Sequence, residues 1–175
     1  MENLITYGLR SLYYALGTDG GYSVPKAYPG AVKISLSPEQ FNLSFTGLDC
    51  IPKDEQTIVY GYKGTLTVAA LLPDFCKDIY GDTVAADGGL IEKITTSIAA
   101  CAILFETDGT PASRHCYYSC RFGRPDFNAE TDTKTKNIST VALPVIIRPN
   151  ANKDLKHILY ENNSSAYQNW FEAVK

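Results

Sequence analysis

The sequence contains histidines and cysteines that are close enough together to be considered as metal ligands. His115 and Cys116 are adjacent, Cys120 follows four residues later, and His157 is the only other histidine. Zinc ligands must converge on one ion at about 2.0–2.3 Å, usually from two short ligand pairs. On a strand, His115 and Cys116 would point to opposite faces, while Cys116 and Cys120 would share a face at a separation of about 13 Å. Because no second ligand pair follows, we interpret these thiols as packed core side chains and expect no bound metal.

The residues that could perform catalysis fall in segments typical of turns. A catalytic cysteine needs a histidine partner, and two histidines in the whole chain make such a pair scarce. The glycine pairs at 20–21 and 88–89 lack the sequence of a phosphate loop and the spacing of a dinucleotide-binding motif. Carboxylates that could act in pairs occur where aspartate is common in turns: Asp108, Asp126, Glu130 and Asp132. We therefore expect a protein that is not an enzyme and has no cofactor.

One segment combines basic and aromatic side chains, which is a pattern found in proteins that bind single-stranded nucleic acid. Its members are Arg114, Tyr117, Tyr118, Arg121, Phe122 and Arg124. The alternative is a strand that buries its aromatic side chains in a core and leaves its arginines in water. The segment lacks the glycine–aromatic order of a ribonucleoprotein motif, so we favour the second interpretation.

Strand patterns dominate the rest of the chain, which is rich in alternating and β-branched residues. The strands are expected at 8–16, 32–37, 41–46, 57–72, 95–106, 116–122 and 139–147. Pro38 is expected to interrupt the hydrogen-bond ladder, and Pro144 favours an edge or a bulge. Gly61 and Gly64 predict a bulge or a sharp bend. Residues 107–111 predict the turn between two of these strands.

Only two segments have helical features. Residues 74–80 follow Pro73 and precede Gly81, which predicts a short helix with Phe75, Cys76 and Ile79 on one buried face. The tail at 164–174 follows a serine that can cap a helix and could add two or three helical turns. The expected fold is mainly β, a sandwich or barrel with one short flanking helix and a C-terminal helix.

Length and composition predict one globular domain over residues 1–175. Hydrophobic residues make up 45% and charged residues 20% of the chain, and the net charge is -3. The negative charge argues against a general nucleic-acid binder. The longest apolar run, residues 98–105, is far shorter than the roughly 20 residues of a membrane helix. The first ten residues show no secretory pattern, so the five cysteines are expected to be reduced thiols in a cytoplasm-like compartment.

The order of several motifs resembles the major tail tube proteins of long-tailed, non-contractile bacteriophages. Residues 7–15 are similar to the start of that family, and residues 72–81 to its short helix that begins with proline. Residues 102–106 and 115–125 resemble its paired strands, which end in a basic and aromatic stretch before proline. Residues 134–148 resemble the strand that follows. The similarity covers most of the chain in the same order.

This resemblance implies a tail-tube-type β-sandwich or barrel that forms six-membered rings, which stack into a hollow tube. The tube is the conduit for genome delivery, and DNA passes through its lumen without specific binding. The implied partners are other copies of the chain and the tape-measure, tail terminator and tail-tip proteins, with no membrane. The implied location is the tail of the virion, after assembly in the bacterial cytoplasm.

The resemblance also suggests two contact regions. The polar segment 47–57 is expected to be a long loop that contacts the next ring, with candidate residues Asp49, Lys53, Asp54 and Glu55; an ordinary mobile hairpin loop is the alternative. Aromatic residues are enriched at subunit interfaces, and the chain has 12 tyrosines and 7 phenylalanines. The basic and aromatic residues of 114–124 are therefore a candidate interface strand.

Two other functions fit the same pattern. The inner-tube subunit of a contractile injection system is similar in fold, and a companion sheath protein would distinguish it. A small-molecule-binding β-barrel would need a closed sheet around an apolar pocket and would remain monomeric at high concentration.

Overall fold

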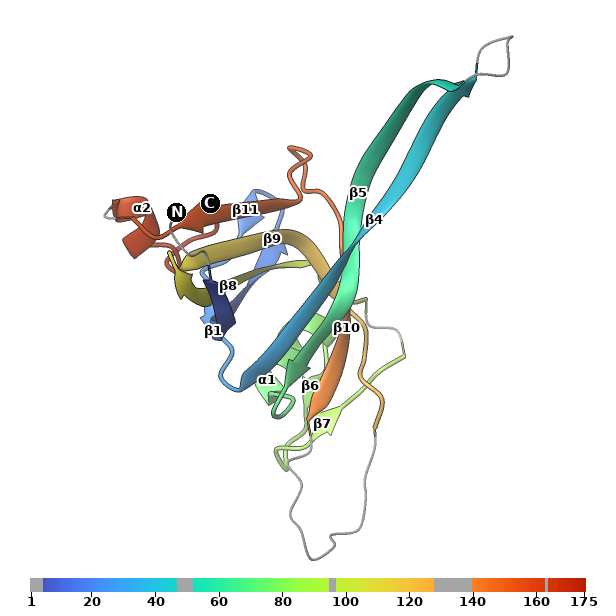
Figure 1. The fold of residues 1–175 in the computed structure, drawn as a ribbon. Helices are drawn as coiled ribbons and strands as arrows, with labels where there is room; N and C mark the ends of the chain where they lie inside the picture. The colour runs from blue at the N-terminus through green and yellow to red at the C-terminus, as the bar shows by residue number, and fades with distance from the viewer. Residues whose placement is uncertain (1–4, 47–51, 95–96, 128–139, 163) are drawn as a thin grey trace, which may run out of the picture.

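The computed structural model describes residues 5–46, 52–94, 97–127, 140–162 and 164–175, and most of them form strands, as predicted (Figure 1). One antiparallel sheet has the order β2-β1-β8-β9-β10-β5-β4, with β3 paired to β1 and β11 paired to β9. Its strands are β1 (Ile5–Thr18), β2 (Gly21–Tyr22), β3 (Lys26–Ala27), β4 (Ala31–Thr46), β5 (Pro52–Val68), β8 (Cys101–Thr110), β9 (Ser113–Phe122), β10 (Val141–Ile147) and β11 (Lys156–Tyr160). A separate two-stranded sheet contains β6 (Thr83–Val84) and β7 (Leu90–Ile91).

Strands β8 and β9 lie at the centre and are buried on both faces. Ile103 and Phe105 of β8 belong to the larger core, which the helical segment 73–80 also joins. Ala102 and Leu104 point to the other face, into a smaller core that contains Trp170. A strand that is covered on both faces has no polar side to alternate with its apolar side. This double burial explains the uninterrupted apolar run in this part of the sequence.

A bulge in β9 changes which face its side chains occupy. Ser119 has φ 45°, and the register between β8 and β9 shifts between the Cys101–Cys120 and Ile103–Tyr117 pairs. A bulge adds one residue and therefore reverses the alternation beyond it. Cys116 consequently lies in the smaller core and Cys120 in the larger core. The prediction that these two cysteines share a face is wrong for this reason.

The short helix occurs where it was predicted. α1 (Pro73–Phe75) continues as a single π-helical turn, η1 (Cys76–Tyr80), and ends at Gly81, which has φ 68°. Glycine adopts this left-handed conformation without steric cost. Phe75, Cys76 and Ile79 are buried, as expected.

Several element boundaries differ from the predictions. β4 continues through Pro38, because β4 is an edge strand, and an edge tolerates proline where its nitrogen faces the free side. β8 runs to Thr110 and leaves a shorter turn than 107–111, while residues 97–100 are not in a strand. Helix α2 covers only Ser165–Gln168, after the Ser164 cap. None of the described helices is long and apolar enough to span a membrane.

Candidate assembly surfaces

The core does not account for the distal part of the β4–β5 hairpin, residues 39–46 and 52–61. β10 pairs with β5 only from Tyr62 to Val68, so beyond Tyr62 the hairpin is a two-stranded ribbon. Figure 1 shows this ribbon projecting from the body of the molecule. Among the described residues, both of its outer edges lack a strand partner. Free edges of this kind are templates for pairing with another chain.

One face of this ribbon is apolar and open to solvent. The apolar members of this face are Phe41, Leu43, Ile58 and Tyr60, whose exposed fractions range from 38% to 51%. Phe41 lies opposite Ile58 in the ladder, and its ring centroid is 5.9 Å from that of Tyr60. The opposite face is more polar, and there Thr57 donates a 2.9 Å hydrogen bond to Asn42. We call Phe41, Leu43, Ile58 and Tyr60 the hairpin apolar face.

Close backbone packing fixes the root of the hairpin. A Cβ atom on Gly64 would lie 1.8 Å from the carbonyl oxygen of Ser35, so only glycine fits between the two strands at this point. Arg148, which follows β10, forms a 2.6 Å ion pair with Glu39 and lies 5.5 Å above the ring of Tyr60. The sheet therefore sets the direction in which the ribbon leaves the body.

Three of the four predicted inter-ring residues, Lys53, Asp54 and Glu55, lie in the distal part of this hairpin. The prediction of a loop over 47–57 is wrong in part, because β5 begins at Pro52 and residues 52–57 are in a strand. Lys53, Asp54 and Glu55 belong to β5, with Asp54 opposite Phe45 and Glu55 opposite Ser44. Asp49 lies outside the described residues. A role for these four residues in contacts between rings stays a prediction.

The basic and aromatic residues of segment 114–124 do not form one continuous surface. Tyr117 and Phe122 are buried in the larger core, and Tyr118 is buried in the smaller core. Arg114 pairs with Glu106 at 2.6 Å and Arg124 pairs with Asp82 at 2.6 Å, whereas Arg121 is exposed. The aromatic side chains are therefore buried, as the favoured interpretation of this segment expects. Its place in a subunit interface remains a prediction.

His115 and the four described cysteines are arranged as packed side chains. Burial raises the pKa of the Cys116 thiol to about 12 and also raises the pKa of Cys101 and Cys120. Such thiols are protonated at neutral pH and therefore make poor nucleophiles and ligands. His115 stacks on Phe105 with ring centroids 5.0 Å apart, and its Nε2 lies 2.9 Å from the Ser113 hydroxyl. Within the described ranges, no group of three or more His, Cys, Asp or Glu side chains could hold a metal ion.

The end of the chain covers the smaller core. We call residues 164–175 the C-terminal cover. Trp170 is fully buried there, beside Leu104 and Tyr118. The Tyr118 hydroxyl donates a 2.5 Å hydrogen bond to the backbone carbonyl of Lys175. The predicted helix over 164–174 was too long, because most of this segment follows the surface of the sheet in turns.

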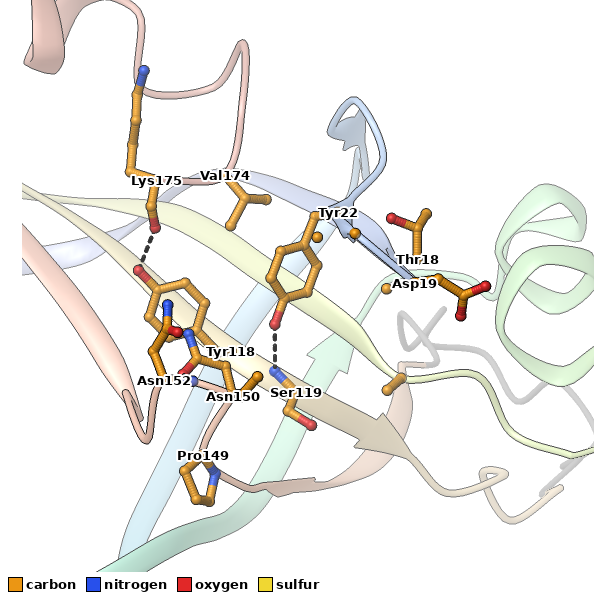
Figure 2. A pocket seen from close by; sticks show the side chains of 15 residues that line it. Thr18, Asp19, Tyr22, Tyr118, Ser119, Pro149, Asn150, Asn152, Val174 and Lys175 are labelled. Atoms are coloured by element: carbon orange, nitrogen blue, oxygen red, sulfur yellow. Dashed lines mark hydrogen bonds between the residues drawn. The ribbon is translucent and has the colours of Figure 1, made fainter.

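An open groove of about 730 Å³ lies beside the C-terminal cover (Figure 2). Its walls come from the turn between β1 and β2, from the bulge in β9, from residues 149–152 and from the last two residues. Figure 2 shows Tyr22 and Tyr118 side by side at its centre, where the Ser119 amide donates a 3.3 Å hydrogen bond to the Tyr22 hydroxyl. The groove is open and has polar as well as apolar lining residues, in contrast to the enclosed apolar pocket of a ligand-binding barrel.

No family model and no curated protein matches the sequence. Among solved structures, the chain is similar to a chain of the sheath–tube complex of PVC, an extracellular contractile injection system, in its extended state. The two chains are 9% identical over 86% of this chain and 88% of that chain, with a TM-score of 0.50.

Two further solved structures are less similar. The cap that terminates the anti-feeding prophage tube has 11% identity over 86% of this chain and 88% of that chain, with a TM-score of 0.42. The sheath/tube terminator of PVC has 11% identity over 85% of this chain and 92% of that chain, with a TM-score of 0.37. Structural similarity at sequence identities this low supports a shared fold and says nothing about function. The comparison with the sheath–tube complex supports the expected architecture, and we conclude that this chain has a tail-tube-type fold.

Proposed function

We propose that this protein is a structural subunit that assembles with copies of itself into a tube and carries out no catalysis. The observation that carries this proposal is the β4–β5 ribbon, with its exposed hairpin apolar face and with two edges that no other described strand pairs. The tail-tube-type fold supports the same conclusion.

An isolated two-stranded ribbon is marginally stable in water, so a ribbon this long needs contacts from elsewhere. Contiguous exposed apolar side chains generally mark a surface where another protein binds. Another copy of the chain can cover the apolar face and pair the free edges at the same time. Each added copy then offers a new ribbon, which allows the assembly to continue.

Two kinds of tube remain candidates. The similarity to a chain of a sheath–tube complex favours the inner tube of a contractile injection system. The tail tube of a long-tailed, non-contractile phage is the second candidate, and it rests on the sequence motifs.

In both kinds of tube, six copies per ring would carry a summed formal charge of about -18, from -3 per chain. A negative charge of this size favours passage of DNA over its retention. Tape-measure, terminator and tip proteins are the partners proposed for either tube.

The purified protein tests self-assembly directly. We expect rings or tubes by negative-stain electron microscopy and large species by sedimentation velocity at high concentration. The double variant F41E/L43E places two charges on the hairpin apolar face and should remain small. Val24→Glu is the matched control, because Val24 is an exposed apolar residue away from the ribbon. Uniformly monomeric wild-type protein at every concentration would contradict the proposal.

A companion sheath protein separates the two kinds of tube. If the chain is an inner-tube subunit, its assembled tubes should bind a sheath protein encoded beside it and should pellet with that protein. Tubes that form without such a partner would favour the non-contractile phage tail. The small-molecule-binding alternative has less support, because the strand order of the described sheet runs openly from β2 to β4.

A further inference from the structure

The two-stranded sheet β6–β7 presents apolar side chains to solvent although its backbone is well ordered by hydrogen bonds. Val84 pairs with Leu90, and Thr83 pairs with Ile91. The Ala85 amide donates to the Gly89 carbonyl at 2.8 Å, and the Asp87 carboxylate accepts a 2.9 Å hydrogen bond from the Gly89 amide. Gly88 has φ 84°, the left-handed conformation that this tight turn requires. The turn is therefore specified by its own residues.

The apolar residues of this element do not belong to either core. Val84, Leu90, Ile91 and Ile94 are each at least 40% exposed, and we call the face formed by Val84 and Leu90 the β6–β7 surface. Val84 and Leu90 lie opposite each other and therefore share a face of the small sheet. Both strands also have one free edge among the described residues. A hairpin that its own hydrogen bonds hold in place, and whose apolar side chains are exposed, is typical of a surface that binds another protein.

Arg124 holds this hairpin to the body by binding both of its ends. The guanidinium forms hydrogen bonds of 2.6 and 3.2 Å with the two carboxylate oxygens of Asp82, the residue before β6. Its Nε forms a 2.9 Å ion pair with Glu92, the residue after β7. The same guanidinium lies 4.6 Å above the ring of Tyr80. These contacts fix the orientation of the hairpin before any partner binds, which lowers the entropic cost of association.

We propose that the β6–β7 surface receives the hairpin apolar face of the next copy of this chain. This inference rests on the proposed function, because it names the surface to which the ribbon binds. The two surfaces lie at opposite ends of the molecule: the ribbon projects upward in Figure 1, and β6 and β7 lie at the lower end. A contact between opposite ends of identical subunits repeats in one direction and leaves both surfaces free at the ends of the stack.

The two surfaces also match in chemistry. Each is apolar at its centre, and each has unpaired strand edges among the described residues that could form hydrogen bonds with the other. Polar side chains lie on the opposite face of each element, with Asn42 and Thr57 on the ribbon and Thr83 on the small sheet. Contact between the two apolar faces would leave these polar side chains outside the interface. Pairing of two ribbons with each other would instead give a closed dimer and leave the β6–β7 surface uncovered.

A complementation experiment tests this contact. The acceptor variant V84E/L90E keeps an intact ribbon, and the ribbon variant F41E/L43E keeps an intact β6–β7 surface. Alone, each variant should no longer elongate into tubes. Replacing two apolar side chains at the contact should weaken the association between subunits on the order of 100-fold. Mixed, they should form one-to-one pairs, because the first supplies the ribbon and the second supplies the acceptor. Sedimentation velocity and mass photometry of fluorescently tagged protein measure these species.

The outcomes separate the two proposals. Wild-type protein that never assembles contradicts the proposed function itself. Wild-type protein that assembles together with an acceptor variant that elongates normally overturns only the present inference. A mixture that stays monomeric, although each variant has lost elongation, also overturns it and points to another occupant of the β6–β7 surface. Val24→Glu is the control for an added surface charge, and V84S/L90S replaces the acceptor variant if V84E/L90E has a lower thermal midpoint than the wild type.

Discussion

The guanidinium carbon of Arg114 lies 4.0 Å from the ring centroid of Tyr167, and the same guanidinium donates a hydrogen bond to the backbone carbonyl of Tyr167. On its other side, Nε of Arg114 forms a 2.6 Å ion pair with Glu106 of β8. Phe171 adds a second ring at 5.0 Å. A single side chain therefore joins the centre of the sheet to the C-terminal cover.

Replacing this arginine with lysine should loosen the cover. Lysine keeps the charge but cannot bind Glu106 and the Tyr167 carbonyl together while its head group lies flat against a ring. We expect Arg114→Lys to lower the free energy of unfolding by about 1–3 kcal/mol, as measured by urea denaturation. Arg10→Lys is the matched control, because the Arg10–Asp108 pair at 2.9 Å is well exposed. That change should cost less than about 0.5 kcal/mol, and equal losses in the two variants would contradict our account.

The root of the ribbon should be sensitive to a single methyl group. In Gly64→Ala, the new methyl would lie within 1.8 Å of the Ser35 carbonyl oxygen, so β4 and β5 must separate. We expect a loss of about 1–3 kcal/mol in the free energy of unfolding, together with slower elongation into tubes. Gly20→Ala provides the comparison, since nothing lies within 4 Å of its added atom. If both substitutions had the same effect, close packing would not be the reason for glycine at position 64.

Stability should decrease on mild acidification because of His115. Burial, with a contribution from the Lys156 ammonium, holds the pKa of His115 below its usual value of 6.5. Below pH 6.5 the unfolded chain therefore binds more protons at this site than the folded chain, and the free energy of unfolding falls as the pH is lowered toward the folded pKa. Urea midpoints at pH 7.5 and 5.5 should differ less in His115→Gln than in the wild type. A difference in His115→Gln as large as that of the wild type would refute this assignment.

The Arg124 contacts should matter more for assembly than for folding. The double variant D82N/R124Q removes both charges at once and so avoids leaving the buried Asp82 carboxylate unpaired. We expect faster amide hydrogen exchange confined to residues 82–94 and a loss of tube formation on the order of 10-fold, because the β6–β7 surface is no longer held in one orientation. Unchanged exchange in this segment would show that Arg124 does not order it.

The sequence predicted the mainly β fold and most of the strands, because their alternation and β-branched residues reflect burial directly. It could not reveal the bulge at Ser119, since serine is an ordinary residue in a strand and its φ of 45° follows from tertiary pairing. This one residue changed the expected positions of Cys116 and Cys120. β11 was also missed, because its residues pair with the part of β9 that β10 leaves free, and no local pattern encodes that pairing.

The candidate surfaces were only partly predictable for a related reason. The alternating residues 41–46 correctly predicted a strand, but alternation cannot distinguish a face that packs on its own core from a face that awaits another chain. The structure makes that distinction, because Phe41 and Leu43 lie beyond the part of the hairpin that β10 supports. The β6–β7 surface had no sequence signal beyond the turn residues at 87–89.

The β4–β5 hairpin also has a consequence for the order of folding. Its strands are neighbours in the sequence, whereas β1 pairs with β8 in distant pairs such as Leu16 with Cys101. Local hairpins form within about 1–10 μs, and contacts between distant segments form more slowly because a long loop must close first. A newly made chain is therefore expected to expose the hairpin apolar face before its central sheet is complete. Premature contacts between unfinished chains are a hazard at that stage, and a slow-folding core would benefit from a chaperone that shields the ribbon until β1 and β8 have paired.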